Sequence, residues 1–371
     1  MPDTLEIAIL GAVPKMNAVV LARCGTNIAI ESLPVGPDLD ALTSFRDHID
    51  QALLSLKERP AETDLKTFGN NLFKYVMRGN VYRIYDALST TALIRLSIFS
   101  NSQELQSLPW EYMQDPEQVA GPWLIRSVVR IIPTTKSNLS DPLKMSDLKR
   151  KLKILFAYAD PVDQDPVSWP AVKDAVERAF VTRIPANNYE LKVIDANPKD
   201  LAEALQANDY DIFHFSGHGI VDQNGVGQLM LMDRAGQKSI PYSAERLSMT
   251  LRSRGIRLVI LSACSTASGN FAEKFDVIAK ALVESGVPAV VANQFPVPDS
   301  TVAAFIKPLY DELLKSGDID KAVNEARFLL ASDPALTQGT AASLEWGIPT
   351  LYRHIAGSQI LETKQGAVGG T

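Results

Sequence analysis

The chain has 371 residues, 46% of them apolar, and its 37 basic and 43 acidic residues leave a net charge of −6. At about 150 residues per domain, this length predicts two domains, each large enough for its own core. The acidic balance, with no dominant basic face, argues against nucleic-acid contact. One basic cluster, at residues 149–153, is interpreted as the solvated flank of a linker.

The N-terminal residues are acidic where a secretory signal peptide would be positively charged, and no apolar run reaches the roughly 18 residues that a membrane span requires. We therefore expect a cytoplasmic protein without membrane contact. The two cysteines, Cys24 and Cys264, lie in separate halves of the chain. This argues against a disulfide framework and against a cysteine-rich zinc site, and it leaves a thiol available for chemistry.

Residues 1–135 are predicted to form an N-terminal α/β domain, because stretches of alternating apolar residues are followed by stretches with a helical period. The predicted strands cover residues 5–11, 18–24, 27–35, 92–100 and 124–133, and the predicted helices cover 38–58 and 62–78. Pro, Ser, Asn and Asp residues between 133 and 147 then predict a linker, taken as residues 136–148.

Strands and helices alternate through residues 149–362, which are predicted to form the second domain. Strands are expected at 153–159, 190–196, 211–217, 257–263, 288–295 and 349–356, a hairpin at 227–240, and helices at 170–184, 198–208, 243–253, 274–285, 300–316 and 318–332. Such alternation predicts a mostly parallel sheet with helices on both faces and a ligand site beyond the carboxyl ends of its strands. Residues 363–371 are expected to be a disordered tail.

Two of these predicted strands lead into residues that can carry out chemistry. His218 follows one in the motif SGHG, and Cys264 follows another in LSACST. If the strands are neighbours, the imidazole and the thiol emerge at the same edge of the sheet, where the imidazole can take the thiol proton and create a nucleophile. Gly217 is expected to turn the chain, and the amides of Gly219 and Cys264 are expected to form an oxyanion hole.

Each motif also has a structural interpretation. SGHG is compatible with a tight turn whose histidine satisfies a carbonyl group, and a lone cysteine at a strand end is most often a small buried apolar residue. Their joint occurrence at one edge, each beside small residues, favours a catalytic pair. His214, inside an apolar strand, is predicted to be a hydrogen-bonded core residue, and neither His48 nor His354 is spaced to share a metal ion with another histidine.

The motifs HFSGHG, LVILSACST, GVPAVVANQFPVPDSTV and WGIPTLYR together resemble the CHAT family of caspase-like cysteine peptidases, in the clan of caspases, metacaspases and separase. The resemblance extends from Leu108 to about Gly357. It implies a caspase-like fold, His218 as general base, Cys264 as nucleophile and the amides of Gly219 and Cys264 as oxyanion hole. No cofactor is implied and no transition-metal site is expected, whereas calcium dependence, found in some clan relatives, stays open. By analogy with larger clan members, the N-terminal segment is expected to be a degenerate caspase-like half.

The same resemblance raises the question of substrate selectivity, which in the clan depends on charges beside the cysteine. Relatives that cleave after Arg or Lys often carry an acid two residues before the cysteine, where this chain has Ser262. Asp160 and Asp299 are candidate pocket acids that compensate. Their structural alternatives are a solvated turn for Asp160 and a helix N-cap for Asp299. A basic residue before the scissile bond is therefore favoured only slightly over a hydrophobic one.

The sequence thus predicts a cysteine endopeptidase that cleaves protein substrates through an acyl-enzyme. The alternative is a catalytically silent CHAT-like scaffold or sensor, against which the intact His and Cys argue. A nucleotide-binding domain is weaker, because G-x-G-x-x-G and G-x-x-x-x-G-K-[ST] are absent from the strand ends. Relatives are commonly bacterial and often act with partners, some in defence or regulated cell death. A regulatory partner or ligand that orders residues 220–240 and 265–275 is therefore expected.

Overall fold

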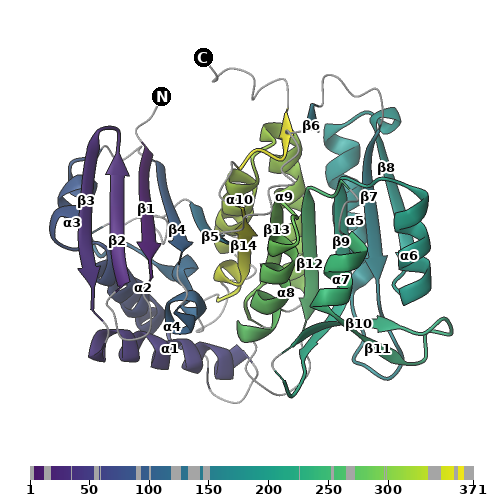
Figure 1. Cartoon of the computed structure of the whole chain (residues 1–371), viewed down its shortest axis with the longest axis horizontal. Helices are drawn as coiled ribbons and strands as arrows, with labels where there is room; N and C mark the ends of the chain where they lie inside the picture. Colours follow the sequence, from purple (N-terminus) through teal and green to yellow (C-terminus); the bar gives the residue numbers. More distant parts are fainter. Residues whose placement is uncertain are drawn as a thin grey trace. The chain divides into compact units, whose positions relative to one another are not determined.

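The computed structural model divides the chain into two compact units (Figure 1). The first unit comprises residues 1–131 and 331–350, and the second comprises residues 132–330 and 351–371. The structure describes residues 4–11, 18–34, 36–53, 58, 60–88, 93–99, 102–117, 127–132, 143–144, 151–224, 226–251, 255–264, 272–295, 297, 299–332, 344–354 and 358–362. No helix among these residues is long and apolar enough to cross a bilayer.

The first unit contains a mixed sheet in the order β5-β4-β1-β2-β3. Its strands are β1 (Thr4–Leu10), β2 (Ala18–Cys24), β3 (Asn27–Leu33), β4 (Leu93–Phe99) and β5 (Ser127–Ile131). β5, β4 and β1 run parallel, whereas β1, β2 and β3 form an antiparallel meander. A two-residue turn joins β2 to β3, with Gly25 at φ 58°, a conformation that glycine adopts without steric cost.

The helices of the first unit include two that the sequence did not predict. Its helices are α1 (Pro37–Leu53), α2 (Glu62–Val76), α3 (Gly79–Asp86), α4 (Gln103–Ser107) and the 3₁₀ turns η1 (Trp110–Tyr112) and η4 (Glu345–Gly347). α1 and α2 confirm the predicted pair. α3 and α4 were missed because both are short, and α3 begins without a side-chain cap that would mark its start.

The second unit contains a parallel sheet in the order β8-β7-β9-β12-β13. Its strands are β7 (Leu152–Tyr158), β8 (Tyr189–Asp195), β9 (Ile212–Val221), β12 (Leu258–Cys264) and β13 (Ala289–Asn293), with the hairpin β10 (Gly227–Met232) and β11 (Ser239–Ser243). The remaining strands are β14 (Pro349–Arg353), β6 (Leu143–Lys144) and β15 (Leu361–Glu362). The parallel core is apolar because it is buried on both faces.

Helices cover both faces of this parallel sheet (Figure 1). They are α5 (Trp169–Arg183), α6 (Pro198–Ala207), α7 (Ala244–Leu251), α8 (Ala272–Glu284), α9 (Asp299–Ser316) and α10 (Ile319–Ser332), with the 3₁₀ turn η3 (Ala186–Asn188). α6, α7 and α8 pack side by side on one face, and α5 packs against α9 on the other. The predicted mostly parallel sheet with helices on both faces is therefore confirmed.

The prediction that Gly217 turns the chain at the end of its strand is wrong. β9 continues through Gly217 and His218 to Val221, and Gly217 has no positive φ. The extension forms because β10 pairs antiparallel with it and so supplies partners for its peptide groups. Close packing explains the glycine instead: a Cβ at position 217 would lie 2.7 Å from Cζ of Phe215 and 3.1 Å from the carbonyl oxygen of Ala159.

The two segments predicted to lack regular structure are largely not described. Of the expected linker, residues 136–148, only β6 is among the described residues, and the expected tail, residues 363–371, lies outside them. The boundaries predicted for the two domains therefore stay predictions.

Candidate active site

The register of β9 and β12 brings the two predicted catalytic positions together. These parallel strands pair from Ile212 with Leu258 to His218 with Cys264, which is the last pair of the ladder. Adjacent strands lie about 4.8 Å apart, so the backbones of His218 and Cys264 are direct neighbours at the carboxyl end of the sheet. The side chain of Cys264 lies outside the described part of the chain.

The imidazole of His218 is held by a backbone carbonyl group. The residue is 2% exposed, and its Nε2 lies 2.7 Å from the carbonyl oxygen of Asp165. Because a carbonyl oxygen only accepts hydrogen bonds, Nε2 carries the ring proton and donates a hydrogen bond to the carbonyl oxygen of Asp165. In the neutral ring, Nδ1 is then the basic nitrogen, so this contact fixes the tautomer in which His218 can take a proton.

The loop that supplies this carbonyl group follows β7 and is held by hydrogen bonds at its base and to the β10–β11 hairpin. Oδ1 of Asp160 accepts a hydrogen bond from the amide of Val167 at 3.0 Å, which closes the base of the loop. The carboxylate of Asp163 accepts from the amide of Ser239 at 2.9 Å, which attaches the loop to the β10–β11 hairpin. The position of the Asp165 carbonyl group therefore depends on side chains that do not touch His218.

A buried polar network lies further back along the same two strands. His214 is fully buried, with Nδ1 3.1 Å from the hydroxyl of Tyr310 and Nε2 2.8 Å from the hydroxyl of Ser262. Burial lowers the pKa of His214 to about 3, because a low-dielectric interior disfavours the charged ring. The prediction of a hydrogen-bonded core histidine is confirmed.

The structure also places the residues predicted for the oxyanion hole and the substrate pocket. Gly219 follows His218 within β9 and pairs in register with Leu229 of β10. Ser262 is 5% exposed and its hydroxyl contacts the His214 ring. Asp160 uses one carboxylate oxygen at the base of the loop, and Asp299 is the first residue of α9, with its side chain outside the described residues. Their roles as oxyanion donor and pocket residues stay predictions.

Two groups that contact the histidines of β9 were not predicted from the sequence. The Asp165 carbonyl group carries no residue-type signal, because every residue has a carbonyl group. Tyr310 was not assigned to His214, although a tyrosine on the buried face of a helix usually needs a hydrogen-bond partner.

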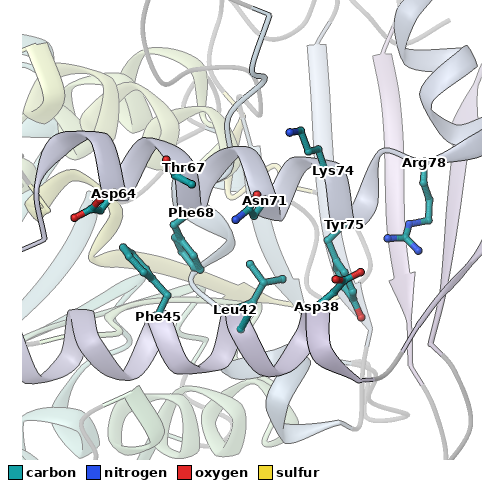
Figure 2. Close-up of a pocket in the computed structure, with 11 residues that line it drawn as sticks. Asp38, Leu42, Phe45, Asp64, Thr67, Phe68, Asn71, Lys74, Tyr75 and Arg78 are labelled. Carbon is teal, nitrogen blue, oxygen red and sulfur yellow. The ribbon is translucent and has the colours of Figure 1, made fainter.

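A cavity of about 480 Å³ lies in the first unit between α1 and α2 (Figure 2). Phe45 and Phe68 stack along it, with ring centroids 4.7 Å apart, and Tyr75 extends the aromatic lining. The charged side chains of Asp38, Asp64, Lys74 and Arg78 stand around it. The lining contains neither a cysteine nor a histidine, so this cavity offers no Cys–His pair.

Comparisons with known proteins place this geometry in a wider context. Residues 66–354 match the CHAT domain family. A search of curated proteins found no match.

Similar solved structures include the separase–securin complex of Saccharomyces cerevisiae, with 10% identity and a TM-score of 0.47, over 95% of this chain and 30% of that chain. The Arg-specific cysteine proteinase gingipain R (RgpB) is 10% identical, with a TM-score of 0.45, over 87% of this chain and 75% of that chain. The complex of Porphyromonas gingivalis RgpB pro- and mature domains gives 9% identity and a TM-score of 0.41, over 86% and 78%. This chain therefore spans less than a third of the separase chain.

Proposed function

Because the chain belongs to the CHAT domain family, we propose that it is a cysteine endopeptidase that acts through His218 and Cys264. The observation that carries the proposal is the in-register pairing of these two positions at the carboxyl end of the β9–β12 ladder. The family match includes both residues, and this edge is where parallel α/β sheets bind ligands.

In the proposed mechanism, Nδ1 of His218 accepts the thiol proton of Cys264, and the sulfur attacks the carbonyl carbon of the scissile peptide bond. The amides of Gly219 and Cys264 donate to the oxyanion of the tetrahedral intermediate. Its collapse breaks the C–N bond while the imidazolium gives its proton to the leaving amine. Water deprotonated by His218 then attacks the thioester, releasing the new carboxyl terminus and restoring the thiol.

In this mechanism, the carbonyl group of Asp165 stabilises the imidazolium form of His218. A carbonyl oxygen 2.7 Å from Nε2 accepts a stronger hydrogen bond when the ring is an imidazolium, so it stabilises His218 after the proton has moved. His214 does not compete for the proton, because burial keeps its ring neutral.

For the substrate, we propose a protein segment with a basic residue before the scissile bond. The loop beside His218 contains three carboxylates, those of Asp160, Asp163 and Asp165, and their combined negative potential favours a cationic side chain nearby. Ser262 lacks the charge that basic-specific relatives often carry at this position. A hydrophobic residue is therefore the competing preference.

We further propose that a partner or ligand activates the enzyme, since unregulated cleavage would damage the cell that makes it. From the family resemblance, we propose that this activation takes place in bacterial defence or regulated cell death. The residues that follow Cys264 and the hairpin after β9 are the segments through which such a partner would act on the pair.

The decisive experiment profiles cleavage of a diverse peptide library by the full chain and by Cys264→Ala, His218→Ala and the control Cys24→Ala, with and without candidate activators. We expect cleavage by the parent and by Cys24→Ala, and none by the first two variants. A peptidyl acyloxymethyl ketone should label Cys264 alone. Cleavage by folded Cys264→Ala contradicts the mechanism, whereas peptide binding without turnover in the parent favours the silent scaffold.

A further inference from the structure

Strand β3 is an edge strand of the sheet of the first unit (Figure 1). It carries two exposed isoleucines. It pairs with β2 on one side, and no described strand pairs with its other side. Ile28 is 62% exposed and Ile30 is 61% exposed. An edge strand of seven residues with exposed β-branched side chains is a template for pairing with another strand.

The register of the β2–β3 hairpin determines which peptide groups of β3 face outward. Cys24 and Asn27 flank the two-residue turn, so they form a hydrogen-bonded pair. Hydrogen-bonded pairs alternate along an antiparallel ladder, so every second residue of β3 after Asn27 bonds to β2. The N–H and C=O groups of Ile28, Ile30 and Ser32 therefore point to the outer edge.

Strand β3 has few of the features that normally protect an edge strand. Its sequence, NIAIESL, contains no proline and no lysine, and Glu31 is its only charged residue. The carboxylate of Glu31 accepts a hydrogen bond from the amide of Asn80 at 2.7 Å, so it is held by the start of α3. Natural proteins usually place charges, prolines or bulges on exposed edges to prevent pairing, and of these β3 has a single charge, which is bound to α3.

We propose that β3 pairs antiparallel with β3 of a second copy of this chain, around a twofold axis at Ile30. In this register Ile30 faces Ile30 of the partner subunit, and Ile28 faces Ser32 of the partner subunit. The peptide groups of Ile28, Ile30 and Ser32 then face the corresponding groups of the second copy. This gives three residue pairs with two hydrogen bonds each, or six hydrogen bonds between the copies. The same segment supplies both sides of the contact, as an isologous dimer requires.

Charge and side-chain packing fit this arrangement. Glu31 lies opposite Ala29 of the partner subunit, so no two carboxylates face each other across the axis. The two Ile30 side chains meet on the exposed face of the sheet and cover one another. Ile30 also pairs with Leu21 of β2, so the apolar row continues inward from the axis in each copy. A second copy of the chain therefore matches β3 both in charge and in side-chain packing.

Single cysteines test the register directly. In a Cys24→Ser, Cys264→Ala background, Ile30→Cys should form an intermolecular disulfide under mild oxidation, because the Cα atoms of a hydrogen-bonded pair lie about 5.5 Å apart. Ile28→Cys is the matched control on the same strand, and its copies would lie about 14 Å apart. Cross-linking of Ile30→Cys but not of Ile28→Cys supports the proposal. Equal cross-linking of both, or of neither, overturns it.

Sedimentation of the full chain gives a second measurement that does not depend on disulfide geometry. The sedimentation mass of the parent should rise from 40.5 kDa to twice that value as its concentration is raised to about 200 µM. Such a concentration is needed because a small interface gives weak association. Ile30→Lys places like charges opposite each other and should weaken the dimer about tenfold or more, whereas Ile28→Lys faces serine and should weaken it less. A parent that stays monomeric, or equal effects of the two folded variants, overturns the proposal.

Discussion

The interior of β9 and its carboxyl end each hold a histidine, and the two differ in the kind of partner that the fold gives them. His214 lies between two hydroxyl groups, those of Tyr310 and Ser262, whereas His218 donates to the carbonyl oxygen of Asp165. A hydroxyl can donate or accept, so His214 is satisfied in either neutral tautomer. A carbonyl oxygen only accepts, so it imposes one tautomer on His218 and tolerates an imidazolium.

This difference shows how the fold gives one residue type two different environments four positions apart on one strand. Burial removes His214 from acid–base chemistry and makes it a structural connector between β12 and α9. The carboxyl end of the strand gives His218 a neighbour in Cys264 and an acceptor for its charged form. We therefore expect that a substitution at one of the two positions cannot give His214 the surroundings of His218, or the reverse.

The largest expected effect is on the reactivity of Cys264. In His218→Ala the thiol loses its base, so peptide turnover should fall by about 10³-fold or more, and the rate of iodoacetamide alkylation at Cys264 near pH 7 should fall about tenfold. Mass spectrometry of the two cysteine-containing peptides measures the second quantity, with Cys24 as internal reference. Unchanged alkylation in folded His218→Ala would show that the register pair is not a functional pair.

His214→Ala should instead affect the fold. It removes a buried ring and leaves the hydroxyls of Tyr310 and Ser262 without their shared partner, so the free energy of unfolding should drop by about 3–5 kcal/mol. Urea denaturation followed by circular dichroism measures this drop. His48→Ala, on α1, is the control and should cost less than about 1 kcal/mol. Equal losses for both variants would contradict the connector role of His214.

The neutral state of His214 also predicts acid lability. An unfolded histidine binds a proton near pH 6.5, whereas folded His214 does so only near pH 3. Between these values the unfolded state binds more protons, so the free energy of unfolding decreases as the pH falls, by roughly 5 kcal/mol over the whole window. His214→Gln keeps hydrogen-bonding groups but does not titrate in this range. Its stability curve between pH 6.5 and 4 should be flatter than that of the parent.

Much of this arrangement was readable in the sequence because it depends on residue type. Near-continuous apolar runs predicted β9 and β12 as buried parallel strands, and the positions of His218 and Cys264 after those runs predicted the shared edge. The buried, hydrogen-bonded state of His214 followed from its place within such a run.

The rest depends on tertiary contacts that leave little trace in the sequence. The end of β9 was misjudged because the pairing strand β10 decides where it ends, and two glycines read locally as a turn. The acceptor for His218 is a backbone carbonyl group placed by loop folding, so its residue type carries no information. The pairing of Ser262 with His214 required the register of two strands and the face that α9 covers.

The smallest expected effect concerns Asp160, and it separates two roles for this residue. If Asp160 positions the loop, Asp160→Ala should lose one hydrogen bond, about 1 kcal/mol, and lower kcat about three- to tenfold with little change in KM. Asp160→Asn keeps an acceptor oxygen for the amide of Val167 and should restore most of kcat. If Asp160 is instead a pocket acid, Asp160→Asn should lower kcat/KM for basic substrates more than about tenfold and leave hydrophobic ones unchanged. Comparing the two variants on a matched pair of peptides, one with Arg and one with Leu before the scissile bond, decides between these roles, because only the pocket role makes the loss depend on the peptide.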